Sequence, residues 1–285
     1  MIQLIPILGA VALATGTIFE KIVLKIKKVN IKQYQTLSFL SIVLAMLPFI
    51  YFFWRMTPEA FETKNLLIFG LVIIFSIIAN LFAFYSLKWE KITNIEPARV
   101  LEPLFVILLA LIFSLFFDHN LYDKNLKIIV PALIAGLALV FSHVKKHHLE
   151  FNKYIIAAIF GSFFFALELV ISRLILDYYS PISFYFIRCS AIFLLSLAIF
   201  RPKLTNLDKK SNLLILLTGI IWFVYRIVLY YGYTHYGIIF TTLMVMLGPI
   251  FIYLFAYKFL KEKLNWRNII AAVVIVLCVL YASLA

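Results

Sequence analysis

The chain alternates long apolar runs with short polar connectors, and the runs have the length of membrane-spanning helices. A helix needs about 20 apolar residues to cross the hydrocarbon core of a bilayer. Because the bilayer offers no partner for backbone N–H and C=O groups, a helix satisfies them internally. The pattern predicts an all-α integral membrane protein with ten transmembrane helices, at residues 3–24, 33–54, 65–87, 92–117, 126–143, 154–176, 181–200, 212–233, 236–260 and 268–285.

Two of these runs, the fourth and the ninth, carry a proline near the middle. The fourth contains LEPLF at 101–105, and the ninth contains LGPIF at 247–251, which lies 146 positions later. Proline removes a backbone hydrogen bond and clashes with the preceding turn. We therefore expect helix breaks at Pro103, Gly248 and Pro249. Paired interruptions at corresponding places in two halves point to the central site of a transporter.

The two halves of the chain also match more widely. Residues around the two prolines match at one offset of 146, and Glu20 matches Glu168 at an offset of 148. Five helices per half is an odd number, so the second half must enter the membrane the opposite way round. The sequence therefore predicts two inverted five-helix repeats, at residues 1–147 and 148–285, an architecture that supports alternating access.

Composition and charge agree with a membrane protein. Of the 285 residues, 65% are hydrophobic and 14% charged, and a soluble surface cannot be built from that mixture. A net charge of +13 raises the question of nucleic-acid binding. However, the lysines lie in short connectors, where they meet lipid headgroups, so we expect no nucleic-acid partner.

The distribution of basic residues predicts an orientation. Eighteen of the 26 Lys and Arg residues lie in or beside the connectors after the odd-numbered runs. The positive-inside rule places these connectors in the cytoplasm. We expect a multi-pass protein of the cell membrane (plasma or inner membrane) with both termini outside.

Glu102 is the leading candidate for an ion-binding role. It lies near the middle of the fourth run, with Arg99 one turn earlier on the same expected helical face. Ionisable residues inside a membrane are functional candidates by default. Two interpretations stay open: Glu102 binds a proton or a substrate ammonium group, or it only pairs with Arg99.

The second half contributes a separate set of charges. Glu168, Arg188 and Arg226 lie in the sixth, seventh and eighth runs. Arginine offers a planar fork for carboxylate or phosphate, so an anion site is one interpretation. An internal salt-bridge network is the other. Asn80 corresponds to Arg226 at an offset of 146, and it either lines a cavity or joins two helices by hydrogen bonding.

No motif of an enzyme or of a metal or cofactor site is present in the sequence. It contains no Gly-rich phosphate loop, no HExxH and no GxSxG. We therefore expect no catalytic residues, no metal and no cofactor. Two classes of membrane protein remain, a transporter and a polytopic protein that does not transport. The second would be either a receptor or an intramembrane enzyme. Ten runs with repeated proline motifs favour the transporter.

Several motifs, taken in order, resemble one known family. FYSLKW at 84–89 followed by LEPLF is similar to the third and fourth helices of the drug/metabolite transporter superfamily, in its ten-helix EamA-type branch. GP at 248–249 followed by LKEKL at 260–264 is similar to that family's closing motif. The resemblance implies secondary transport of small metabolites, such as amino acids or drugs, by proton coupling or exchange. The expected partners are a small-molecule substrate and the lipid bilayer, with the protein a monomer or homodimer.

Overall fold

The computed structural model describes residues 5–117, 122, 125–143, 152–202, 207–260 and 266–284. The predicted boundary between the halves, at 147–148, and most of the closing motif, at 261–264, lie outside these residues. Within them the chain is helical. Its elements are α1 (Ile5–Leu24), α2 (Ile31–Phe53), η2 (Pro58–Phe61), α3 (Thr63–Trp89), α4 (Ile92–Arg99), α5 (Leu101–Phe116), α6 (Leu126–His143), α7 (Lys153–Arg173), η4 (Leu176–Tyr178), α8 (Pro181–Phe200), α9 (Lys209–His235), α10 (Ile238–Val245), α11 (Gly248–Leu260) and α12 (Trp266–Leu284).

Ten helical segments fit the ten predicted runs, and the fourth and ninth runs are each divided into two helices. The break in the fourth falls at Val100, between α4 and α5. The break in the ninth falls between Val245 and Gly248. Both fall just before the proline, which corrects the prediction that the helices break at the prolines themselves.

The position of each proline explains this shift. Pro103 is the third residue of α5, and Pro249 is the second residue of α11. The first N–H groups of a helix have no intrahelical acceptor, so a proline there loses nothing. The clash of the ring with the preceding turn then ends the helix before it. Gly248 serves packing, because a Cβ atom there would lie 2.8 Å from Leu13 of α1.

Capping side chains fix where several helices begin. Asn30 accepts a hydrogen bond from the Lys32 N–H at the start of α2. Asn152 accepts from two backbone N–H groups at the start of α7. Ser180 accepts from Ser183 at the start of α8, where Pro181 occupies the first helical position. Each cap satisfies a donor that the helix leaves unpaired.

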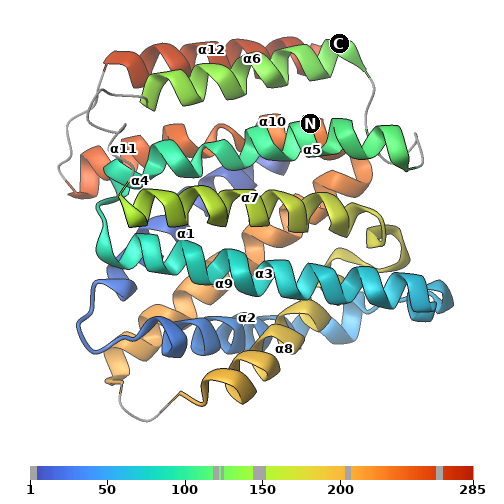
Figure 1. Cartoon of the computed structure of the whole chain (residues 1–285), viewed down its shortest axis with the longest axis vertical. Helices are drawn as coiled ribbons and strands as arrows, with labels where there is room; N and C mark the ends of the chain where they lie inside the picture. The colour runs from blue at the N-terminus through green and yellow to red at the C-terminus, as the bar shows by residue number, and fades with distance from the viewer. Residues whose placement is uncertain are drawn as a thin grey trace.

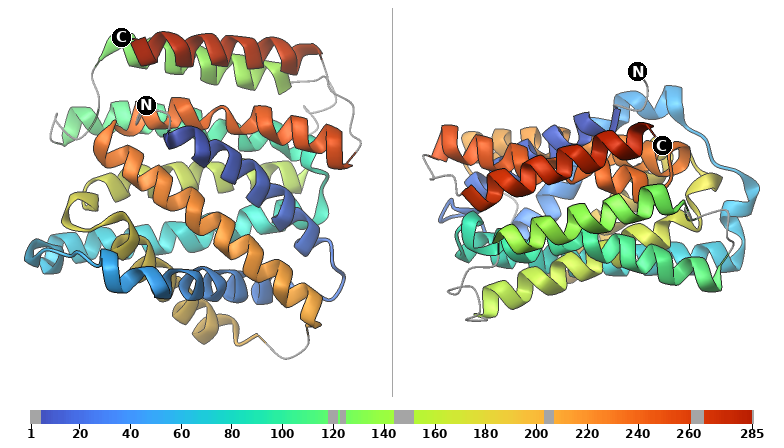
Figure 2. Two further views of the ribbon diagram at one scale, coloured as in Figure 1. Left: turned by 180° about the vertical axis from the view of Figure 1, so that it is seen from behind. Right: turned by 90° about the horizontal axis from the view of Figure 1, so that it is seen from above.

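The helices pack in pairs drawn from the two halves of the chain. α3 lies against α7 on one face of the bundle, and α1 lies against α9 on the other. α2 pairs with α8 along one edge, and α6 pairs with α12 along the opposite edge (Figures 1 and 2). This arrangement leaves a central region between the α3–α7 face and the α1–α9 face.

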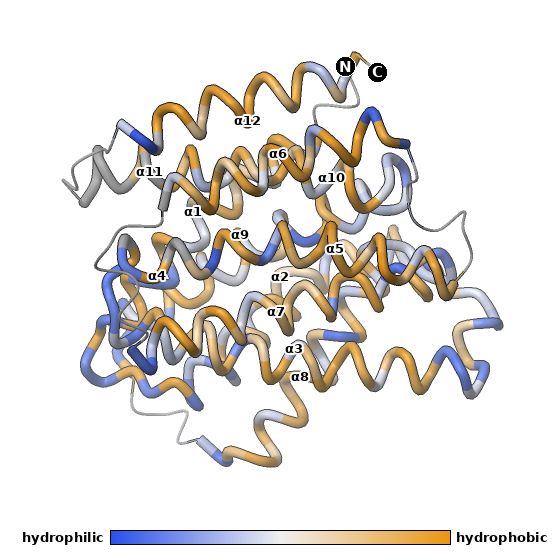
Figure 3. The backbone as a smooth tube through the Cα atoms, turned by 45° about the horizontal axis from the view of Figure 1, so that its top comes forward, coloured by the Kyte–Doolittle hydropathy of each residue, from blue (hydrophilic) through white to orange (hydrophobic). Residues whose placement is uncertain are grey.

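The outer surface of the bundle is apolar along the helices. Six helices of the described residues are long and apolar enough to cross a membrane, and four further apolar segments are shorter. Hydrophilic residues gather mainly at the ends of the helices and in the connectors (Figure 3). Leu115, Leu194 and Ile199 are among the large hydrophobic side chains that stay exposed, which suits contact with lipid. The chain is a multi-pass membrane protein.

Candidate functional site

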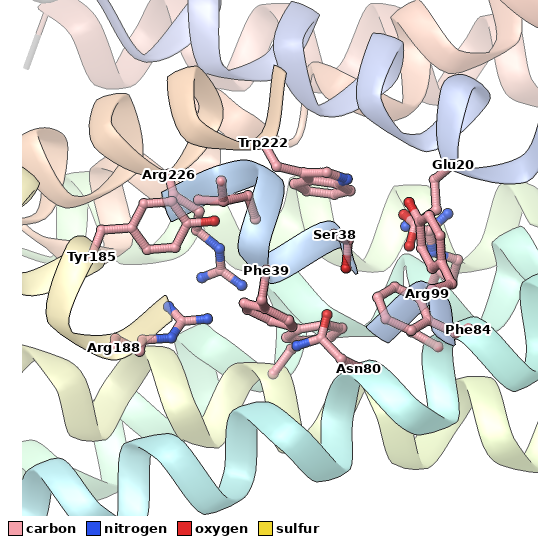
Figure 4. Close-up of a pocket in the computed structure, with 14 residues that line it drawn as sticks. Glu20, Ser38, Phe39, Asn80, Phe84, Arg99, Tyr185, Arg188, Trp222 and Arg226 are labelled. Atoms are coloured by element: carbon pink, nitrogen blue, oxygen red, sulfur yellow. The ribbon is translucent and has the colours of Figure 1, made fainter. Parts of the chain in front are cut away.

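A polar pocket lies in the central region between the two halves. Its walls come from α1, α2, α3 and α4 of the first half and from α7, α8 and α9 of the second. Figure 4 shows its charged side chains in two groups, with Ser38, Phe39, Asn80 and Trp222 between them. The space open to the centres of water molecules is about 50 Å³, which is enough for a few waters.

The group formed by the second half centres on Glu168. Its Oε1 lies 2.9 Å from Nη1 of Arg188, and its Oε2 lies 3.3 Å from Nη1 of Arg226. The three residues come from α7, α8 and α9, and all are buried. One carboxylate therefore joins three helices. The internal network proposed from the sequence is present, and the same arginines line the pocket.

Two hydroxyl groups complete the surroundings of this carboxylate. Tyr230 donates to Glu168 Oε1 over 3.2 Å, and it accepts a hydrogen bond from Arg188. Ser172, one turn along α7, lies with its hydroxyl 3.2 Å from Glu168 Oε1 and 2.7 Å from the Glu168 backbone carbonyl, and it can donate to either. Because buried charges are costly unless paired and hydrogen-bonded, this network offsets the cost of removing Glu168 from water.

Aromatic rings face the two guanidinium groups. Arg188 lies over the Tyr185 ring, with 5.4 Å between the guanidinium carbon and the ring centroid. Arg226 lies over Phe165 at 5.7 Å and over Tyr225 at 5.8 Å. Such cation–π contacts are strongest where water is excluded. The rings hold both arginines at the pocket wall, where planar groups can stack.

The group at the other end of the pocket comes from the first half. Glu20 of α1 is buried and lines the pocket with Arg99, the last residue of α4. Arg99 donates to Thr17 Oγ1 over 3.4 Å. Asn80 lines the wall between the two groups, and its amide donates to the Ser76 carbonyl over 2.7 Å. The cavity interpretation of Asn80 therefore fits its position.

Glu102 lies in a neighbouring pocket at the helix breaks. This second pocket is lined by Glu102, Pro103 and Pro249, together with Arg99 and Tyr225. The break at Val100 separates Arg99 from Glu102, so these two residues do not share one helical face as the sequence suggested. Arg99 lines both pockets and thereby connects them.

Sequence reasoning misjudged or missed some of these residues. Glu20 was noted only as a match to Glu168, although a carboxylate in the first apolar run is itself a signal of function. Tyr185 carried no signal, because its role depends on the neighbouring helix. Arg173, the last residue of α7, is also buried, and it forms an ion pair with Asp177 at 2.8 Å.

The described residues contain no group of three or more His, Cys, Asp and Glu side chains arranged to hold a metal ion. Cys189 and Cys278 are free thiols. The pocket itself is lined by charged, hydroxyl, amide and aromatic groups. Such groups bind and orient a solute or an ion.

Comparison with known proteins agrees with this description. A crystal structure of a protein with 16% sequence identity superimposes with a TM-score of 0.65, over 98% of this chain and 95% of that chain. This likeness concerns the fold alone. No curated protein matches the chain by sequence. The model of the EamA-like transporter family matches residues 152–284. The second half of the chain is therefore similar to the EamA-like transporter family, of the drug/metabolite transporter superfamily.

Proposed function

We propose that this protein is a secondary transporter that moves a small metabolite across the cell membrane by alternating access. The observation that carries the proposal is the polar pocket, which both halves of the chain line in the middle of apolar helices. Uphill movement would be driven by a proton gradient or by exchange. Glu102 is the first candidate for the proton site and Glu168 the second.

The pairing of helices supports an inverted repeat. If α1 to α6 correspond in order to α7 to α12, exchanging the halves converts the α1–α9 pair into the α7–α3 pair. Both pairs are packed together. The α2–α8 and α6–α12 pairs convert into themselves, and both are also packed. A two-fold relation between the halves accounts for all four pairs. If α4 and α5 together form one membrane-spanning segment, each repeat has five such segments. Because five is an odd number, the second repeat is then inverted relative to the first.

Individual side chains support the same relation. Tyr34 of α2 meets Phe84 of α3 edge to face, with ring centroids 4.9 Å apart. Phe184 of α8 meets Tyr230 of α9 edge to face at 5.1 Å. The members of the two pairs are related by offsets of 150 and 146, close to the offset of 146 found at the prolines. Each pair borders the pocket or its charged network.

A contact between connectors supports alternating access. Met56, after α2, forms an isolated antiparallel bridge with Tyr179, before α8. Beside it, the N–H of Thr57 donates to the Tyr178 carbonyl over 2.9 Å. The bridge ties the two halves together at one end of the bundle, and in this proposal it is a closed gate. Three further hydrogen bonds join Phe53 and Arg55 to Ser180 and Ser183. Because each hydrogen bond contributes a net stabilisation of only about 1 kcal/mol, such a gate can open during each cycle.

The test is flux into proteoliposomes. Purified protein would be reconstituted, loaded with pooled metabolites and assayed for uptake of the same labelled compounds, with and without a pH gradient. Uptake above that of protein-free vesicles, and above that of a variant with Arg226→Gln, is the expected result. If no metabolite pool and no proton flux exceeds the protein-free background, the transport proposal fails.

A further inference from the structure

The charges that line the central pocket do not balance. Two arginines, Arg188 and Arg226, meet a single carboxylate, that of Glu168, whereas at the other end Arg99 lines the pocket with Glu20 and also borders the pocket of Glu102. The excess positive charge lies where the helices exclude water, since Arg188 is 1% exposed and Arg226 is 5% exposed. A buried charge is costly unless an opposite charge lies beside it. The imbalance therefore favours a bound anion.

Several N–H groups of these arginines have no acceptor among the described residues, and this also favours a bound anion. Within the described part of the chain, Nε of Arg188, Nη1 of Arg226 and Nη1 of Arg99 have no hydrogen-bond acceptor. The Arg226 atom lies 3.3 Å from Glu168 but outside hydrogen-bond geometry, so that contact is electrostatic only. In Figure 4 the guanidinium groups of Arg188 and Arg226 extend toward the same space beside Phe39. A carboxylate bound there would accept hydrogen bonds from both.

The remaining walls define the rest of the ligand. Phe39, Phe165, Tyr185 and Trp222 line the pocket around the arginines. Their faces suit an apolar, planar body more than a hydrated inorganic ion. At the far end Glu20 already faces Arg99, so that end has no excess negative charge to attract a ligand ammonium group.

We propose that the pocket binds a small organic monoanion, with its carboxylate between Arg188 and Arg226 and its apolar or aromatic body against Phe165, Tyr185 and Trp222. This inference rests on the proposed function, because it names the class of solute that the transporter carries. It selects anions over the cations and neutral molecules that an electrically balanced pocket would accept.

The test uses four ligands that share one phenyl body and differ in charge. They are 3-phenylpropionate, phenylalanine, 2-phenylethylamine and 3-phenylpropan-1-ol, titrated calorimetrically into the protein in lipid nanodiscs. We expect 3-phenylpropionate to bind at least tenfold more tightly than the amine and the alcohol, and at least as tightly as phenylalanine. Phosphate and chloride should compete with it only weakly.

Variants then locate the site. Arg226→Gln removes the surplus charge and leaves Glu168 paired with Arg188, so this variant should fold and should lose the preference for the anion. Arg226→Lys keeps the charge and should retain the preference with weaker binding, because the planar fork is lost. The control is Arg173→Gln, a buried arginine paired with Asp177 outside the pocket, and it should bind like the wild type.

Several results would overturn the inference, and titration of the four ligands into the wild-type protein can already give them. These are tighter binding of phenylalanine, equal binding of the amine or alcohol, complete competition by inorganic anions, or no binding of the anion with a Kd below about 1 mM. A preference unchanged by Arg226→Gln would also overturn it. Binding is measured without a gradient, so selective binding without flux would contradict only the transport proposal. Flux of cations alone would contradict only this inference.

Discussion

Nη1 of Arg188 lies 2.9 Å from Oε1 of Glu168, and this ion pair joins α8 to α7 with both side chains buried. Arg226 of α9 approaches the other carboxylate oxygen. One glutamate thus holds three helices of the second half at the wall of the central pocket. Its removal should affect the stability of the fold as well as the site.

We expect Glu168→Gln to destabilise the protein by about 3–5 kcal/mol, because it leaves two buried guanidinium groups without their counter-charge. Thermal unfolding in detergent, followed by circular dichroism, measures the effect. Asp177→Asn is the control, because its pair with Arg173 has one partner 53% exposed. A pair of that kind contributes roughly 0–1 kcal/mol. Equal losses of stability in the two variants would contradict this view of the network.

Close packing of α2 against α9 depends on Gly219. A Cβ atom there would lie 2.7 Å from Ser41 Cβ and 3.0 Å from the Ile42 backbone nitrogen. Backbone atoms cannot move aside, so Gly219→Ala should cost about 1–3 kcal/mol by overpacking. Gly70→Ala is the matched control in α3, where a Cβ atom would meet nothing within 4 Å. We expect that variant to be as stable as the wild type or slightly more stable. Melting temperatures in the opposite order would contradict the packing described for α2 and α9.

Glu102 is the first candidate for the residue that carries the coupled proton. It lies at the break between α4 and α5, in the pocket that both prolines of the repeated motif, Pro103 and Pro249, also line. If Glu102 carries the coupled proton, Glu102→Gln should remove the pH dependence of flux into proteoliposomes while exchange continues. Asp177→Asn should keep that dependence. An unchanged pH profile in Glu102→Gln would exclude the coupling role.

The proposed orientation makes a prediction for chemical labelling. Lys27, after α1, and Lys64, at the start of α3, are both exposed and lie in connectors assigned to opposite sides. In a variant without native cysteines, Lys64→Cys should react with a membrane-impermeant thiol reagent in intact cells. Lys27→Cys should react only after the cells are opened. The reverse pattern would place both termini in the cytoplasm.

Much of the fold could be predicted from the sequence, because apolar runs of about 20 residues have few alternatives in a bilayer. All ten runs became helical segments, and both interrupted runs were identified. The exact breaks could not be placed, because proline is tolerated in the first turn of a helix as well as excluded from its middle. Val100 carries no signal of its own.

The site was predicted less completely, because it depends on which helices meet. Arg188, Arg226, Asn80 and Arg99 do line one pocket. Their grouping with Glu20 follows from the packing of α1 beside α9 and from the contact of Arg99 with Thr17 of α1, which no local pattern reveals. The partners of Glu168 were named as possibilities, and only the crossing of three helices decides that both arginines reach the same carboxylate.

The central claim is that the pocket opens to alternate sides of the membrane as the two halves move, and a reversible cross-link tests it most directly. Met56 and Tyr179 oppose each other in an antiparallel bridge. Opposed residues in such a pairing have Cα atoms about 4.5–5.5 Å apart, within the range that a disulfide can span. Met56→Cys with Tyr179→Cys, in a variant lacking Cys189 and Cys278, would be oxidised and assayed for flux in proteoliposomes. We predict that flux stops on oxidation, returns on reduction and is unaffected by oxidation in either single variant. Full flux through completely cross-linked protein would contradict the account.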